Sequence, residues 1–268
     1  MKKRLLYLFT VMLGLAALSL CFKVAWYWGC HWYRERVVLG EREAVNKAVA
    51  QAEKGGALET ALVEAVDDLL ARRGLCASLE VLSGVQARIN SKEYYLILVS
   101  IGELFEKALK EGCEESIVRT LDEHSNDADV IECFLRAAYY GEKYMVAKQR
   151  LQRRVRECMR SHLPSVICQA AGVLAVLEND ADVELIADVF LSKAVDRSDF
   201  ELLECLLVEL CVFEERAYGA LRRVREVAMR LQKPRASELR TLIEKVVYSR
   251  IGANYSVVFP GAATPQED

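Results

Sequence analysis

Apolar residues recur at helical spacing through most of this chain, between stops placed at regular intervals. The segment near the C-terminal end has the clearest stripe, made of Leu239, Leu242, Ile243, Val246 and Val247. Positions three, four and seven apart lie on one face of an α-helix, so such a stripe marks the buried side of an amphipathic helix. A strand-rich fold would need many tight turns, yet the 268 residues include only 14 glycines and 4 prolines. The pattern predicts an all-α fold.

The predicted helices end at residues that favour caps and turns. Arg72 and Arg73 followed by Gly74 make a basic last turn with a glycine suited to a left-handed cap. Ser91 can cap a central buried helix that runs to Gly112. Further stops lie at residues 124–127, 141, 163–165, 179–180, 196–199 and 234, and the last helix ends at residue 252. These intervals predict about nine helices joined by short turns.

The sequence Asn-Asp-Ala-Asp-Val occurs twice, at residues 126–130 and 179–183. Both copies lack the glycine and the distal glutamate of an EF-hand loop, so we interpret them as helix starts, where Asn and Asp accept hydrogen bonds from open amides. The repeat favours duplicated helix pairs. Pairs stacked side by side form an α-solenoid-like helical repeat, and a helical bundle is the alternative arrangement. The consensus residues of tetratricopeptide and ankyrin repeats do not occur.

The N-terminal region has the composition of a membrane anchor. Residues 5–22 carry no charge, and all three tryptophans follow within residues 26–32. As a helix the uncharged run would span about 27 Å, close to the ~30 Å hydrocarbon core of a bilayer, and tryptophan prefers the headgroup level. We therefore predict a single transmembrane signal-anchor with an aromatic interfacial belt at 1–33, a helical-repeat domain at 34–252 and a flexible tail at 253–268.

Two other fates of the N-terminal region stay open. Ala17 and Ser19 could serve a signal-cleavage site, and residues 18–21 resemble a bacterial lipobox in which leucine precedes Cys21. The basic cluster at residues 2–4 directly abuts the apolar run and favours an internal N-terminus. We thus expect a single-pass membrane protein with its body outside the cytoplasm, or alternatively a lipoprotein or a secreted protein.

The cysteines argue against an exterior body. Seven of the nine lie after the aromatic belt, and this odd number cannot all pair within the chain. No pair has the spacing of a zinc or thioredoxin-like site. Free cysteine behaves as a small hydrophobe, and five of them fall on apolar helical stripes: Cys133, Cys158, Cys168, Cys205 and Cys211. Either the exterior is poor in oxidants or the predicted orientation is reversed.

Charge alternates in blocks along the body. Residues 113–132 and 178–204 are acidic, whereas residues 142–160 and 222–250 are basic. One interpretation is solvated faces with modest ion pairs between neighbouring helices. The other is a site for an acidic protein segment or anionic lipid, built from clustered arginines. A net charge of −3 and the lack of interleaved aromatic residues argue against a nucleic-acid partner, and none is expected. The candidate binding residues are Arg150, Arg153, Arg154, Arg160, Arg222, Arg223, Arg225 and Arg230.

The C-terminal residues lack a helical period. Residues 253–268 contain two prolines, and residues 255–259 are strand-forming types that could add to the sheet edge of a partner.

The sequence contains no catalytic motif, no glycine-rich phosphate loop and no cluster of metal-ligating residues, and it has only 3 histidines. We predict no enzyme activity, no cofactor and no metal. The expected function is a protein–protein interaction scaffold or assembly factor at a membrane. The alternative is an enzyme with a non-motif active site, which an enclosed cleft holding His124 or His162 beside carboxylates would favour.

Overall fold

The described part of the chain is all-α, as predicted. The computed structural model describes residues 36–47, 58–83, 92–195, 200–232 and 235–261, and these contain no β-strand. Residues 36–47 are helical. They are followed by α2 (Leu58–Ser83), α3 (Lys92–Glu111), α4 (Glu114–Glu123), α5 (Ala128–Tyr140), α6 (Glu142–Met145), α7 (Gln149–Cys158), α8 (Pro164–Leu177), α9 (Asp180–Val195), α10 (Phe200–Val212), η1 (Glu214–Ala217), α11 (Tyr218–Arg230), α12 (Arg235–Ile251), η2 (Gly252–Asn254) and α13 (Tyr255–Val258).

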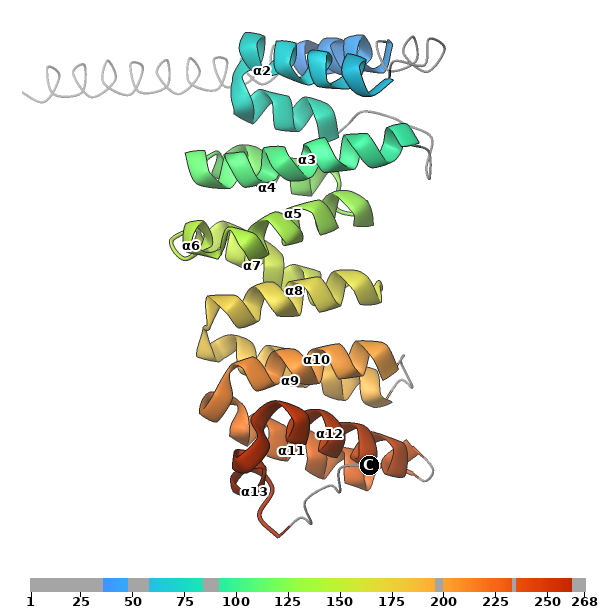
Figure 1. The fold of residues 1–268 in the computed structure, drawn as a ribbon, viewed down its shortest axis with the longest axis vertical. Helices are drawn as coiled ribbons and strands as arrows, with labels where there is room; N and C mark the ends of the chain where they lie inside the picture. The colour runs from blue at the N-terminus through green and yellow to red at the C-terminus, as the bar shows by residue number, and fades with distance from the viewer. Residues whose placement is uncertain (1–35, 48–57, 84–91, 196–199, 233–234, 262–268) are drawn as a thin grey trace, which may run out of the picture.

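The helices stack along the long axis of an elongated body (Figure 1). In the first row, α3, α5, α8, α10 and α12 follow one another, each in contact with the next. The second row consists of α4, α7, α9 and α11; α4 contacts α7, and α9 contacts α11. Cross-contacts from α7 to α8, α9 to α10 and α11 to α12 join the two rows. A single apolar core therefore runs between them along the stack.

Two glycines end helices where the sequence predicts. Gly74 has a φ of +75° and kinks α2 into two parts, and Gly112 has a φ of +79° after α3. Side chains other than glycine rarely adopt a positive φ, so each glycine lets the chain turn at low cost. Arg72 and Arg73, just before the kink, also bind Glu41 through hydrogen bonds of 2.9–3.0 Å. These contacts attach residues 36–47 to α2.

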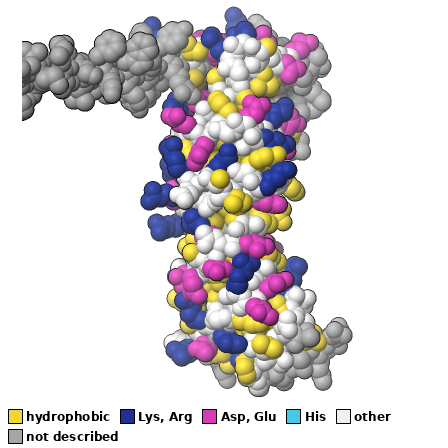
Figure 2. Space-filling view, turned by 90° about the vertical axis from the view of Figure 1, so that its left-hand side faces the viewer, with side chains coloured by type: hydrophobic (Ala, Val, Ile, Leu, Met, Phe, Trp, Pro, Cys, Tyr) yellow, Lys and Arg dark blue, Asp and Glu magenta, His cyan; other side chains and the backbone are white. Residues whose placement is uncertain are grey.

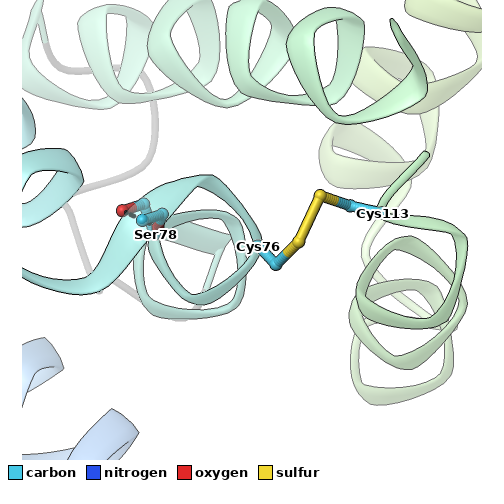
Figure 3. The surroundings of a disulfide bond; sticks show 4 residues. Cys76, Ser78 and Cys113 are labelled. Atoms are coloured by element: carbon cyan, nitrogen blue, oxygen red, sulfur yellow. Dashed lines mark hydrogen bonds between the residues drawn. A yellow bond between two sulfur atoms is a disulfide. The ribbon is translucent and has the colours of Figure 1, made fainter. Parts of the chain in front are cut away.

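A disulfide bond joins the second part of α2 to the start of α4 (Figure 3). The Cα atoms of Cys76 and Cys113 are 5.8 Å apart and 37 positions apart in the sequence. Beside it, the Ser78 hydroxyl donates a 2.8 Å hydrogen bond to the carbonyl of Gly74, on the same turn of helix. Sequence reasoning identified no pairing. The five thiols that remain among the described cysteines are the ones expected on apolar stripes, and all are at least partly buried: Cys133, Cys158, Cys168, Cys205 and Cys211.

The repeated Asn-Asp-Ala-Asp-Val sequence starts a helix in both copies, with a shift of one residue. Asp127 caps α5 and accepts hydrogen bonds from the amides of Asp129 and Val130. In the second copy the side chain of Asn179 accepts from the amide of Ala181. The capping interpretation is therefore confirmed for one residue of each copy.

The expected continuous helix over residues 142–160 is broken into α6 and α7. The side-chain amide of Gln152 donates hydrogen bonds to the carbonyls of Met145 and Val146, at 3.0 and 2.9 Å. A side chain therefore satisfies carbonyls that backbone amides would occupy in a continuous helix. The buried stripe of α7 is correspondingly short, with Leu151 and Val155 inside.

The structure also differs from the expectation for the C-terminal residues. Tyr255, Val258 and Phe259 are almost fully buried, and residues 255–258 form α13 rather than an extended segment. The Tyr255 ring packs edge-on against Tyr248 and Phe259, with centroids 5.6 and 5.2 Å away. Aromatic burial of this kind outweighs the weak helical pattern of the sequence. Residues 262–268 of the predicted tail lie outside the described residues.

The predicted apolar stripes form the core. On α12, Leu239, Ile243, Val246 and Val247 are buried, and Leu242 packs at the edge. Between α3 and α5, the rings of Phe105 and Phe134 meet edge to face at 5.6 Å. Burying a side chain of this size stabilises a fold by roughly 1.5–3 kcal/mol.

The predicted anchor at residues 5–22 and the aromatic belt lie outside the described residues. Within the described ranges, none of the helices combines the length and the apolar character needed to cross a bilayer.

Candidate protein-interaction surfaces

Four of the eight candidate arginines make contacts within the chain. Arg154 forms ion pairs with Asp122 on α4 and with Glu157 one turn further along α7. Arg223 on α11 contacts Glu184 and Asp188 on α9, at 2.8 and 2.9 Å. These two arginines join neighbouring helices of opposite charge, as the ion-pair interpretation predicts.

Arg222 and Arg225 hold the C-terminal residues against α11. Arg222 donates hydrogen bonds to the carbonyls of Val257 and Val258, at 2.8 and 2.9 Å. Arg225 forms an ion pair with Glu244 on α12 at 2.9 Å, and its guanidinium lies 5.1 Å from the centroid of the Phe259 ring. Both arginines therefore contribute to packing of the C-terminal helices.

The other four arginines are exposed and make no ion pair with any residue that the structure describes. Arg150, Arg153 and Arg160 belong to α7 and the turn after it, and Arg230 ends α11. Residues three positions apart lie on one helix face, so Arg150 and Arg153 share a face of α7. Together with Arg160 in the turn after the helix, we call them the basic patch. Figure 2 shows Lys and Arg side chains gathered along one edge at the height of α6 and α7. Binding of an acidic partner here stays a prediction.

A buried ion pair between α7 and α9 was missed from the sequence. Arg156 donates hydrogen bonds of 2.6 and 2.9 Å to the two carboxylate oxygens of Asp182, which is 1% exposed. The hydrogen bond with Asp182 raises the pKa of the Arg156 guanidinium above its ordinary value. The sequence feature that could have indicated a buried aspartate is the second Asn-Asp-Ala-Asp-Val copy. Asp182 has the same position in that copy as the half-buried Asp129 has in the first.

Two adjoining cavities form a groove along the solvent side of the first row. One, of about 300 Å³, lies between α3 and α5, and the other, of about 360 Å³, lies between α5, α8 and α10. Arg136 and Tyr140 on α5 line both of them, so the two cavities adjoin at α5. The Tyr140 side chain is 75% exposed, and that of Tyr139 is also exposed. We call this feature the first-row groove.

The floor of the second cavity contains polar groups. Glu209 on α10 and Gln169 on α8 line it together with Gly172 and Cys168. Burial raises the pKa of the Glu209 carboxyl, which Arg250 on α12 opposes through space. A hydrogen bond with Cys168 and burial raise the pKa of the Cys205 thiol, so this thiol stays protonated at neutral pH.

A third cavity, of about 370 Å³, lies between the turn before α5 and the α7–α8 turn. His162, Arg160 and Glu157 line it, together with Asn126. Its one carboxylate, that of Glu157, is held by Arg154. His162 is exposed, and so this open cavity lacks the enclosed pairing of histidine and free carboxylates that an acid–base site needs.

The other described histidine does not line any of these three cavities. His124 follows α4, and burial lowers the pKa of its imidazole, which lies 3.9 Å from a carboxylate oxygen of Asp127. Within the described ranges no three His, Cys, Asp or Glu side chains are grouped to hold a metal ion.

Comparisons with known protein families, with curated proteins and with solved structures each return no match for this chain.

Proposed function

We propose that this chain is a membrane-anchored α-solenoid that acts as a protein–protein interaction scaffold or assembly factor. The observation that carries the proposal is the first-row groove, which crosses α3, α5, α8 and α10 and exposes two tyrosines. Stacked helices that contact mainly their neighbours present extended surfaces of this kind to partners. Tyrosine is enriched in such surfaces because it combines a large apolar ring with a polar hydroxyl.

The sequence of residues 5–22 supports the membrane anchor, and the disulfide supports a body outside the cytoplasm. Disulfides persist in oxidising compartments, and the bond between Cys76 and Cys113 accords with export of the body. The five thiols are half-buried or buried, which limits their access to oxidants. Free cysteines are therefore compatible with a body outside the cytoplasm.

The enzyme alternative has less support. The best place for an active site is the cavity lined by His162, but Glu157, the carboxylate in that lining, already forms an ion pair with Arg154. A carboxylate that is held in an ion pair is a poor general base, because the positive charge lowers its affinity for a proton. The scaffold is therefore the function that the geometry favours.

Photo-crosslinking in native membranes tests the scaffold proposal. A photoreactive phenylalanine analogue is placed at Tyr140 in the groove and, as a matched control, at Met229, an exposed residue of α11 in the second row. We expect one discrete product from position 140 and none from position 229. The crosslinked protein, once identified and purified, should bind the full chain, and Tyr140→Ala should weaken that binding at least tenfold. Equal, diffuse products from both positions would contradict a partner in the groove.

Alkaline carbonate extraction tests the anchor separately. We expect the full-length chain to stay in the membrane pellet, since a helix over residues 5–22 would be held by the apolar core of the bilayer. Release of the full-length chain into the supernatant would exclude the anchor.

A further inference from the structure

We infer that the first-row groove binds a basic segment of a partner protein and seats one lysine or arginine side chain against Glu209 and Gln169. This inference rests on the proposed function and specifies the partner. The occupant is identified by the hydrogen-bonding and charge properties of the second cavity, between α5, α8 and α10.

Two hydrogen-bond acceptors at the floor of this cavity lack donors. The side-chain oxygen of Gln169 is buried and accepts no hydrogen bond. The Glu209 carboxylate is half-buried and accepts none from the side chains that the structure describes; Arg250 acts on it only through space. A buried acceptor without a donor is unfavourable, and a carboxylate removed from water favours a cation. Arg136 also lines this cavity but makes no ion pair with Glu209, so a lysine ammonium or an arginine guanidinium of a ligand can supply the N–H donors that the carboxylate lacks.

The walls of the cavity suit the stem of such a side chain. A Cβ atom placed on Gly172 would lie 3.7 Å from a carboxylate oxygen of Glu209 and 3.7 Å from the ring of Tyr139. The carboxylate and the aromatic ring therefore border the same space above Gly172. A basic side chain there lies beside a hydrogen-bond acceptor and packs its apolar stem against an aromatic ring, while the exposed ring of Tyr140 covers neighbouring apolar groups of the ligand.

The charge of the adjoining cavity also favours a basic ligand. The cavity between α3 and α5 is lined by four carboxylates, those of Glu103, Glu106, Asp129 and Glu132, and by one guanidinium, that of Arg136. Lys110 neutralises Glu106, and the remaining excess is still negative. A segment with further basic residues is therefore attracted along the groove, whereas an acidic peptide or an anionic lipid is repelled.

A peptide series tests the inference with purified full-length protein in detergent. The probes are four fluorescein-labelled peptides that share a Leu-Xaa-Leu centre between Gly-Ser flanks, where Xaa is lysine, arginine, norleucine or glutamate. We expect the lysine and arginine probes to bind at least tenfold more tightly than the norleucine and glutamate probes, measured by fluorescence anisotropy, because a charge-assisted hydrogen bond replaces an unpaired acceptor.

Glu209→Gln and Glu204→Gln form a matched pair of variants on α10. Glu204 is exposed and does not line the groove, whereas Glu209 lines its floor. We expect Glu209→Gln to lose the preference for basic probes and Glu204→Gln to keep it. Folding of both variants is checked by thermal melting, and Glu209→Gln should be no less stable than the parent because it removes a half-buried charge.

Three results would overturn the inference. They are equal binding of the lysine and norleucine probes, an unchanged preference for basic probes in Glu209→Gln, and a dimer in which the basic patch of a second copy of this chain occupies the groove. The last is recognised by sedimentation: dimers that Arg150→Glu, Arg153→Glu and Arg160→Glu dissociate would make a second copy the occupant. A partner crosslinked at Tyr140 without any basic preference would leave the scaffold proposal intact, whereas no crosslink at Tyr140 would remove both.

Discussion

Arg156 on α7 donates two hydrogen bonds, of 2.6 and 2.9 Å, to the almost fully buried carboxylate of Asp182 on α9. The pair lies between two successive helices of the second row and links them by charge. Once one partner is removed, the other charge is left in the interior without compensation.

Arg156→Ala should therefore lower the free energy of unfolding by about 3–5 kcal/mol. The matched control is Arg153→Ala on the same helix, which removes an exposed arginine with no ion pair to a described residue and should change stability by about 0.5 kcal/mol or less. Urea unfolding monitored by circular dichroism measures both. Similar losses in the two variants would show that the buried pair contributes little.

Loss of the disulfide should destabilise the N-terminal end of the stack. With 37 positions between Cys76 and Cys113, the constraint on the unfolded chain corresponds to about 4 kcal/mol. Cys76→Ser should show most of that loss, whereas Cys158→Ala, which removes a thiol outside the bond, should show the smaller effect of a truncated side chain. Mass spectrometry of unreduced peptides identifies the bond, and its absence from protein isolated from membranes would contradict the structure.

Val246→Asp should unfold or aggregate the body, because the Val246 side chain is buried in the core stripe of α12 and a charge there has no partner. Lys245→Asp changes the exposed neighbouring position and should melt within a few degrees of the parent. If both variants melted at similar temperatures, Val246 would not lie on the core face of α12.

Glu209 should make stability depend on pH in the direction opposite to that of a salt-bridged acid. Burial raises its pKa in the folded state above that of the unfolded chain, so the folded state binds its proton more tightly. Its contribution to the free energy of unfolding should thus rise as pH falls through the folded pKa towards the unfolded one. Above the folded pKa the ionised carboxylate destabilises the fold. Urea unfolding across this range should show a slope that Glu209→Gln removes and Glu204→Gln retains.

The basic patch should serve binding rather than folding. Glutamate at Arg150, Arg153 and Arg160 together should leave the melting temperature within a few degrees of the parent, since these residues make no ion pair with described residues. Binding to phosphatidylserine-containing vesicles should fall, most clearly at low salt, because screening sets in over about 10 Å at 0.1 M. Arg154→Glu is the contrasting control, because it breaks the contacts with Asp122 and Glu157 and should lower stability by about 1 kcal/mol. A large loss of stability in the triple variant would assign the patch to folding.

The sequence predicts helices best where a glycine or a cap decides the boundary locally. Gly74, Gly112 and Asp127 all end or start helices as expected, because a positive φ or a capped amide depends on only a few neighbouring residues. The break after Met145 depends on a side-chain hydrogen bond from Gln152, and helical periodicity carries no trace of it. Helix 255–258 is similarly invisible, since its stability comes from Tyr248 and two arginines elsewhere in the chain.

The candidate surfaces show the same division. Clusters of arginine are visible in the sequence, but whether an arginine is free or paired depends on which acidic helix packs beside it. Arg150 and Arg154 differ in this way although they lie one turn apart. The first-row groove brings Gln169 and Glu209 together from α8 and α10, and no spacing within the sequence indicates that they share a floor.

The stacked rows also govern how the body opens. Because α2 and α12 lie at opposite ends (Figure 1) and successive helices contact mainly their neighbours, cooperativity between the two ends must pass through every helix in between. The disulfide fastens only the α2–α4 end. We expect hydrogen exchange to be slowest in the middle helices α5 and α8, and the α11–α13 end to open independently of the rest. Such a body can loosen one end to admit a partner while the remainder keeps its shape.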